Sequence, residues 1–282
     1  MNNDVTVILL THKSKNLALK YIAPIYNHFN IIIIDNSNDI TLENDIKKNF
    51  PKVIIRFMPN NGYGAAINFG SRLVQTKYFL ISNPDLTGIE NDNLLKFVDA
   101  ANKLEDKFSV LGPRYLNADP KSLRQTIDNN DISEMKFLSG ACMFFNKKNF
   151  DLIGGFDEKI FLYFEENDLC KRSYKYYKNY QINNVKVLHD AGNSVYIESH
   201  EDQLKHDNFR TWHFIWSKFY YYKKHYTYLF ASLYFFPILI RILIRVAINK
   251  LRNDHKSLNK YKSRLSGLYN SMIGNKSFLR KS

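Results

Sequence analysis

The sequence is poor in cysteine, glycine and proline, with 2 Cys, 11 Gly and 7 Pro in 282 residues. Two cysteines, Cys142 and Cys170, cannot build a disulfide scaffold, and the low glycine and proline content excludes collagen-like chains. Residues 1–15 lack the charged start and long apolar run of a secretory signal. Because 45% of the residues are apolar, we expect a protein with a buried core in a reducing, cytosolic compartment.

Acidic residues are almost absent from the C-terminal part. Residues 205–282 hold 16 Lys or Arg but only two acids, whereas residues 1–204 hold 24 basic and 25 acidic residues. The net charge of +13 therefore lies entirely after residue 204, in a part that is also rich in Trp, Tyr and Phe. These shifts predict an electroneutral domain over 1–204 and a basic, aromatic, helical region over 205–282.

Short apolar runs rich in Val and Ile alternate with helix-compatible stretches in the first part. The predicted strands are 5–10, 31–34, 53–57, 78–81 and 185–188, and the predicted helices include 17–27 and 63–74. This alternation favours an α/β fold with a mostly parallel sheet. Ligands bind at the carboxyl ends of strands in such sheets, where polar clusters stand here: Thr11-His12-Lys13, Asp35-Asn36-Ser37 and Asn83-Pro84-Asp85.

A glycine-rich loop, Asn60-Asn61-Gly62, opens the predicted helix at residue 63. A helix N-terminus with small residues suits a phosphate or a sugar diphosphate, although a turn without a ligand has the same pattern. A plain turn is also an alternative for Asn83-Pro84-Asp85. The convergence of several such clusters favours a binding site.

Carboxylates gather among aromatic residues in Tyr163-Phe164-Glu165-Glu166-Asn167-Asp168. In a structural interpretation, these acids compensate the dipole at the start of a helix. In a functional interpretation, the apolar surround raises their pKa values, and one acts as a general base. His189 ends the last predicted strand, where it suits either a structural bond or a contact with a metal or a diphosphate.

Taken in order, these segments resemble the family 2 glycosyltransferases of the GT-A fold, and within them the rhamnosyltransferase-like branch of bacterial O-antigen and capsule synthesis. The resemblance runs from Val5 to Ser194 and includes two further segments, Ser139-Gly140-Ala141-Cys142-Met143 and Gly155-Phe156-Asp157-Glu158. It implies an α/β, Rossmann-like GT-A domain with the helical region appended.

The resemblance also implies roles for individual residues. The implied donor-binding residues are Thr11, His12, Asp35, Ser37, Asn61, Gly62, Asn68 and Asn83. The implied sugar and acceptor pocket is Gly140, Ala141 and Met143, and the implied metal ligands are Asp85 and His189. The implied base is Glu166, with Glu165 and Asp168 as supports. Two residues depart from the family pattern: Glu166 stands where an Asp is usual, and Lys13 where many relatives have Asn.

The implied reaction is inverting transfer of a sugar from a nucleoside diphosphate to a hydroxyl of a lipid-linked saccharide. The resemblance favours L-rhamnose from dTDP-rhamnose, with a UDP- or GDP-sugar as the alternative. A carboxylate takes the hydroxyl proton, while Mg²⁺ or Mn²⁺ stabilises the leaving diphosphate. Asn83-Pro84-Asp85 has a single acid, so diphosphate and water would supply most ligands of the cation.

The uncharged run over residues 226–240 is followed by Arg241 and Arg245. Its 15 residues fall short of the ~20 that a spanning helix needs, so we expect no span. On a single helix, Arg241, Arg245, Arg252 and Lys256 form a basic stripe typical of a segment attracted to anionic lipids. The sequence thus predicts a peripheral protein on the inner face of the cell membrane. In the alternative, the aromatic residues pack onto the catalytic domain or onto a second subunit of a homodimer.

Three other classes compete. A nucleic-acid-binding protein would use the basic tail, but it leaves the acidic cluster unexplained, and we expect no nucleic-acid partner. A nucleotidyltransferase would need a basic, glycine-rich segment near the first strand, and none is seen in the sequence. An inactive scaffold is the third class, which hydrolysis of nucleotide sugars would exclude.

Overall fold

A computed structural model describes residues 4–117, 125–126, 130–190 and 199–279. The chain forms two compact units, Met1–Asp157 with Glu166–Tyr196, and Glu158–Glu165 with Ile197–Ser282. The predicted boundary after residue 204 falls inside α8 (His200–His225), because the charge changes there whereas the helix begins after its cap, Ser199. Ser194, the last residue of the resemblance, lies outside the described residues.

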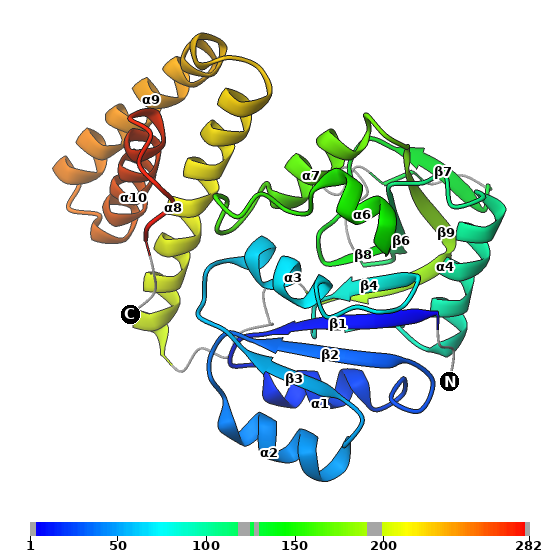
Figure 1. Cartoon of the computed structure of the whole chain (residues 1–282). Coiled ribbons are helices and arrows are strands. Elements are labelled where there is room, and N and C mark those ends of the chain that lie inside the picture. The colour runs from blue at the N-terminus through cyan, green and yellow to red at the C-terminus, as the bar shows by residue number, and fades with distance from the viewer. Residues whose placement is uncertain (1–3, 118–124, 127–129, 191–198, 280–282) are drawn as a thin grey trace. The chain divides into compact units, whose positions relative to one another are not determined.

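The first unit is built on a nine-stranded sheet with the order β3-β2-β1-β4-β8-β6-β9-β5, and β7 pairs with β9 (Figure 1). The strands are β1 (Val5–Thr11), β2 (Asn30–Asp35), β3 (Ile54–Phe57), β4 (Tyr78–Ser82), β5 (Leu86–Thr87), β6 (Val110–Tyr115), β7 (Ile132–Met135), β8 (Cys142–Asn146) and β9 (Asn179–His189). The first four pair in parallel, as predicted. The sheet as a whole is mixed, because β8 pairs antiparallel with both β4 and β6.

Helices cover both faces of this sheet. One face carries α1 (Lys15–Ile22), α2 (Ile40–Asn49) and α4 (Asn91–Lys103), and the other carries α3 (Tyr63–Ser71), α6 (Lys147–Ile153) and α7 (Glu165–Ser173). Successive residues of a strand point to opposite faces, so Val7 joins the first layer and Ile8 the second. Helix α1 ends before the predicted residue 27, since Pro24 follows closely and cannot donate a helical hydrogen bond.

Strand direction places several chain segments at one edge of the sheet. Thr11 and Asp35 are partners in register at the carboxyl ends of β1 and β2. Strands β6 and β9 are parallel to each other, and β6, like β4, runs antiparallel to β8. Tyr115 and His189 therefore lie at the same edge as Ser82, the last residue of β4.

The second unit is a helical bundle of α8, α9 (Tyr228–Leu251) and α10 (His255–Met272). Its core includes Phe219 of α8, Phe235 of α9 and Leu268 of α10. A Cβ on Gly267 would lie 2.5 Å from the carbonyl oxygen of Trp212, so the close approach of α10 to α8 requires glycine.

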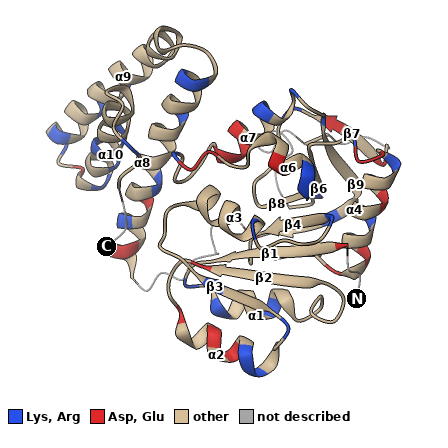
Figure 2. Cartoon of the chain, in the orientation of Figure 1, with Lys and Arg blue, Asp and Glu red and all other residues tan. Residues whose placement is uncertain are grey.

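The predicted basic stripe does not lie on one helix. Helix α9 ends at Leu251, and Asn253 adopts the left-handed conformation (φ 52°) between α9 and α10. Lys256 therefore lies on α10, whereas Arg241 and Arg245 lie on α9. Figure 2 shows Lys and Arg along all three helices of the bundle, with few acids among them.

Among the described residues, α9 is the one helix long and apolar enough to cross a membrane. Its most apolar 18-residue window has a mean hydropathy of 1.9, and 17% of that window is buried. The helix is longer than the predicted run because it continues through Arg241 and Arg245. A helix of this length and composition suits both a membrane span and a position along a membrane surface.

Candidate functional site

Asp35 organises the carboxyl ends of β1 and β2. Its carboxylate is fully buried and accepts hydrogen bonds from Thr11 Oγ1 (2.8 Å), from the backbone N–H of Ser37 (3.0 Å) and from that of Asp39 (3.0 Å). The hydroxyl of Ser37 also donates to it. Asp35 thereby fixes the turn that the resemblance assigns to the donor nucleotide.

A second layer of polar contacts joins this turn to its neighbours. Nδ1 of His12 lies 2.7 Å from Oδ1 of Asn36, and the side-chain amide of Asn36 donates to Asn60 (3.3 Å). Asn60 also accepts from the backbone N–H of Gly62 at the start of α3 (3.3 Å). Sequence reasoning chose Asn61, which is exposed, and missed Asn36 and Asn60. Both missed residues belong to the polar clusters already noted in the sequence, and this position could have identified them.

Asn68 makes hydrogen bonds to the backbone of Phe156 within the first unit. Its amide Nδ2 donates to the carbonyl of Phe156 (3.0 Å), and its Oδ1 accepts from the N–H of Phe156 (2.9 Å). Gly155 is left-handed (φ 65°), and a Cβ there would lie 2.6 Å from Oδ1 of Asn68. The structure thus places Asn68, expected to contact the donor, as a clamp between α3 and the turn at Gly155.

Asp85 and His189 lie together at the sheet edge. Nε2 of His189 is 3.3 Å from Oδ1 of Asp85, and the Asp85 side chain is 2% exposed. Within the part of the chain that the structure describes, that oxygen accepts no hydrogen bond. A buried carboxylate oxygen without a donor, beside an imidazole nitrogen, fits a divalent cation. Among the described residues, no three His, Cys, Asp or Glu side chains form a metal-binding group, so these two would supply the protein's share of the ligands.

The segment before β8 connects the Asp85 turn to α7. The carbonyl of Ala141 accepts from the backbone N–H of Asn83 (2.9 Å). The carbonyl of Gly140 accepts from the hydroxyl of Tyr63 on α3 (2.6 Å), a residue that sequence reasoning did not single out. A Cβ on Gly140 would lie 3.3 Å from Cβ of Glu166.

Met143 does not line this edge. It is fully buried in the core beneath α3, α6 and α7, which corrects its expected place in the acceptor pocket. The side chains of a strand alternate between the two faces, and the backbone of β8 turns Met143 inward.

Glu166 has the properties of a general base. Desolvation by burial raises its pKa to about 7, and the backbone N–H groups of Glu166 and Asn167 partly oppose this rise. The side-chain amide of Asn167 donates to Oε1 of Glu166 (2.8 Å). A carboxylate with a pKa near neutrality takes a proton from a substrate efficiently.

The other two acids of α7 differ from Glu166 in their surroundings. Asp168 is fully buried and accepts from Nε of Arg172 (2.8 Å), whose remaining nitrogens donate to the carbonyls of Ile153 and Gly155. Arg172 thereby ties α7 to the end of α6, and Asp168 holds the Arg172 guanidinium in place. Glu165, the first residue of α7, is buried.

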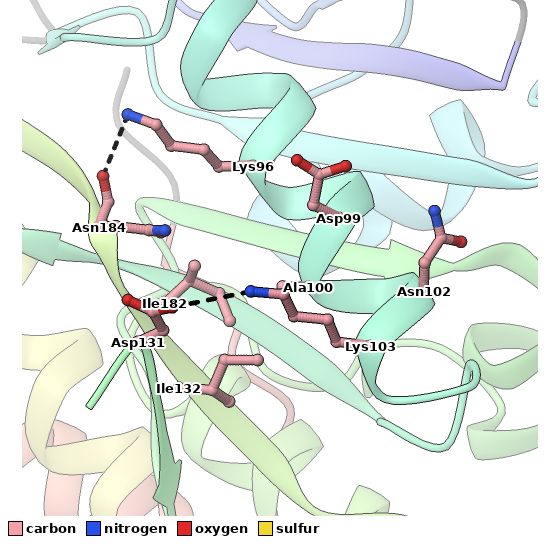
Figure 3. Close-up of a pocket in the computed structure, with 9 residues that line it drawn as sticks. All are labelled: Lys96, Asp99, Ala100, Asn102, Lys103, Asp131, Ile132, Ile182 and Asn184. Carbon is pink, nitrogen blue, oxygen red and sulfur yellow. Dashed lines mark hydrogen bonds and ion pairs between the residues drawn. The ribbon is translucent and has the colours of Figure 1, made fainter.

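A cavity of about 280 Å³ lies elsewhere in the first unit, between α4 and strands β7 and β9 (Figure 3). Nζ of Lys103 is 3.6 Å from Asp131 across it, and Lys96 donates to a backbone carbonyl of β9 (3.3 Å). Its wall contains Ile182, toward the opposite end of β9 from His189. This cavity is therefore separate from the cluster at the sheet edge.

Comparison with known proteins shows what this chain is similar to. The family model described as glycosyl transferase family 2 matches residues 6–245. The low-salt glycan biosynthesis hexosyltransferase Agl10 of Haloferax volcanii is 22% identical over 215 residues, 67% of this chain and 66% of that protein. The chain thus matches just under two thirds of that relative.

Solved structures show the same fold. The mannosyltransferase PcManGT of Pyrobaculum calidifontis, in complex with GDP-Man and Mn²⁺, aligns with a TM-score of 0.57 and 14% identity, over 96% of this chain and 86% of that chain. TarS residues 1–349 of S. aureus, in complex with UDP, aligns with a TM-score of 0.54 and 12% identity, over 96% and 92% of the two chains.

Proposed function

The chain belongs to glycosyl transferase family 2, and we propose that it transfers a sugar, with inversion, from a nucleoside diphosphate to an acceptor hydroxyl. One observation carries this proposal most directly. The buried Oδ1 of Asp85, which accepts no hydrogen bond from the described residues, and the Nε2 of His189 meet at the carboxyl edge of the sheet, where α/β proteins bind nucleotides.

The Asp35 turn and the start of α3 are proposed to bind the nucleotide and its phosphates. Asp35, Thr11 and Ser37 form a rigid, preorganised turn. The N-cap of helix α3 is Gly62, which has no side chain to accept from the first backbone N–H groups of the helix, and such N–H groups suit an anionic phosphate. His12, Asn61 and Asn83 remain predicted donor contacts.

Asp85 and His189 are proposed to hold Mg²⁺ or Mn²⁺. Such a cation would neutralise the charge that develops on the leaving diphosphate. The presence of Mn²⁺ in the mannosyltransferase of the same fold supports this proposal. The residues of this chain would hold the cation and leave its other ligand sites to phosphate oxygens and water.

Glu166 is proposed to accept the acceptor's proton. The acceptor oxygen attacks the anomeric carbon, the bond from that carbon to the diphosphate breaks, and the hydroxyl proton moves to the Glu166 carboxylate. A single displacement of this kind inverts the anomeric configuration. Gly140 and Ala141 lie next to Glu166 and next to Asn83, respectively, so they are the proposed floor of the sugar site.

The proposed donor is dTDP-rhamnose, on the resemblance alone. Binding is tested by thermal shift with dTDP-rhamnose, UDP-GlcNAc and GDP-mannose, each with Mn²⁺, with Mg²⁺ or with EDTA. We expect one nucleotide to raise Tm in the presence of a cation, and hydrolysis or transfer to follow the same preference. If no nucleotide sugar raises the Tm of the protein and the protein hydrolyses or transfers none of them, the protein is an inactive scaffold.

The acceptor is proposed to be a lipid-linked saccharide, met at the inner face of the cytoplasmic membrane. Helix α9 presents exposed apolar side chains, including Leu229 (68%), Leu233 (67%) and Phe236 (61%). Its exposed Arg241 and Arg245 add the positive charge that anionic lipids attract. An apolar face flanked by arginines fits a lipid surface better than it fits water.

A further inference from the structure

A basic groove of about 630 Å³ lies within the second unit, between α8 and α10. Its lining contains four cationic residues, Arg210, Lys256, Lys260 and Arg264, and one carboxylate, Asp207. This volume is within the range of small-molecule sites, about 300–1,000 Å³. The groove is thus large enough for a ligand and strongly positive.

The positive charge of the groove is not neutralised within the described chain. Lys256, Lys260 and Arg264 stand four residues apart on one face of α10, and none forms an ion pair with a described carboxylate. Asp207 accepts a hydrogen bond from Gln203 on its own helix (3.0 Å). Like charges at this spacing destabilise a helix, so a bound anion would offset a repulsion that the protein otherwise retains.

The remaining cation connects the groove to the segment before the base. Nε of Arg210 donates to the hydroxyl of Tyr163 (2.5 Å), and its guanidinium lies 5.8 Å from the centre of the Tyr163 ring. Tyr163 (φ 66°) and Phe164 (φ 69°) are both left-handed, a conformation that non-glycine residues keep only when contacts hold it. Arg210 therefore helps to fix the chain that leads into Glu166.

We propose that this groove binds the phosphate or diphosphate group of the acceptor, a proposal that rests on the proposed glycosyltransferase function. Tyr163 stands three residues before Glu166, so their Cα atoms are at most about 11 Å apart along the chain. A phosphate held beside Tyr163 would bring the acceptor saccharide within reach of Glu166. The groove would then select acceptors that carry a phosphate. The donor site does not contact this phosphate of the acceptor.

The test uses inorganic pyrophosphate as the probe and the full-length protein in EDTA, where cation-dependent binding at Asp85 is suppressed. Calorimetry compares wild type with K256Q/K260Q and with the matched control K262Q/K276Q, whose lysines are exposed and lie outside the groove. We expect K256Q/K260Q to bind pyrophosphate at least about tenfold more weakly, and the control to stay within about twofold of wild type. Equal weakening in both variants, or no binding by wild type, would overturn the proposal.

Two further measurements are needed. The first distinguishes a lipid headgroup from the acceptor as the source of the phosphate, and the second distinguishes the groove proposal from the glycosyltransferase proposal. Binding to phosphatidylglycerol vesicles should be alike in K256Q/K260Q and K262Q/K276Q. A selective loss in K256Q/K260Q would assign the groove to lipid headgroups and overturn the acceptor role. Donor binding with Mn²⁺ should be unchanged in K256Q/K260Q, so failure of the groove proposal leaves the glycosyltransferase proposal measurable by itself.

Discussion

Gly140 lies directly against Glu166, since a Cβ at position 140 would stand 3.3 Å from Cβ of Glu166. That separation is closer than ordinary van der Waals contact, and Gly140 has no left-handed backbone that alanine would strain. Gly140→Ala should therefore displace the carboxylate slightly without unfolding the chain. We expect kcat to fall by about tenfold, since small misplacements of a catalytic group are costly, with donor Kd nearly unchanged. An unaltered kcat in Gly140→Ala would contradict the contact.

Glu166→Gln should lower transfer by roughly 10²–10⁴-fold, because it keeps the shape and removes the proton acceptor. The base acts as a carboxylate, so with a pKa of about 7 the rate of the wild type should rise with pH to a plateau above neutrality. Glu166→Gln should lose this limb, whereas Glu166→Asp should retain it. If Glu165→Gln is the crippled variant instead, the two glutamates exchange roles.

Asp85→Asn should abolish cation-dependent donor binding, because a neutral amide is a weaker ligand for Mg²⁺ or Mn²⁺ than a carboxylate. His189→Ala should weaken it to a lesser extent. The matched control is Asp190→Asn, an exposed acid next in sequence to His189. Calorimetry with Mn²⁺ and the donor nucleotide measures all three, and donor binding by Asp85→Asn that still responds to Mn²⁺ would refute the assignment.

Asn68→Ala should destabilise the protein by about 1–3 kcal/mol, because it leaves the N–H and the carbonyl of Phe156 without their partner. Chemical denaturation measures this loss. The donor Kd, taken under conditions where the variant is folded, should change less than in Asp85→Asn. A variant of full stability that no longer binds donor would restore the donor contact expected from the sequence.

Leu229→Gln with Leu233→Gln should weaken binding to anionic vesicles by about 100-fold, if both leucines enter the lipid. The control pair, Tyr269→Gln with Ile273→Gln, removes side chains that are 60% and 54% exposed but belong to α10 or follow it. Vesicle flotation compares the pairs. Added salt should weaken the binding of the wild-type protein to anionic vesicles, because it screens the charges of Arg241 and Arg245.

A wild-type protein that ignores anionic vesicles at low salt, yet forms a dimer that the leucine pair disrupts, would assign α9 to an oligomer interface. Truncation is a poorer test of this prediction. Removing the second unit also removes the contacts that Arg210 and Ser217 make with Tyr163 and Leu162, just before Glu166.

Local pattern was sufficient to predict β1 to β4 and the polar clusters that follow β1, β2 and β4, but it did not predict β5 to β8 and found only the last part of β9. Continuous apolar runs identify β1, β2 and β4, and parallel pairing brings Thr11 and Asp35 together. Asp85 and His189 were both expected to serve the cation and the diphosphate, and Nε2 of His189 lies 3.3 Å from Oδ1 of Asp85. These features follow from periodicity and from the common edge at which parallel strands end.

The tertiary structure decided which of the expected residues reach that edge. The Asn68 side chain is hydrogen-bonded to the backbone of Phe156, and Met143 lies in the core. Both outcomes arise because side-chain direction depends on the register and packing of neighbouring elements. Ala141 meets Asn83 because β8 inserts antiparallel beside β4, far from it in sequence. The raised pKa of Glu166 is likewise a consequence of burial. Burial depends on every element packed around a residue, so no single segment of the sequence determines it.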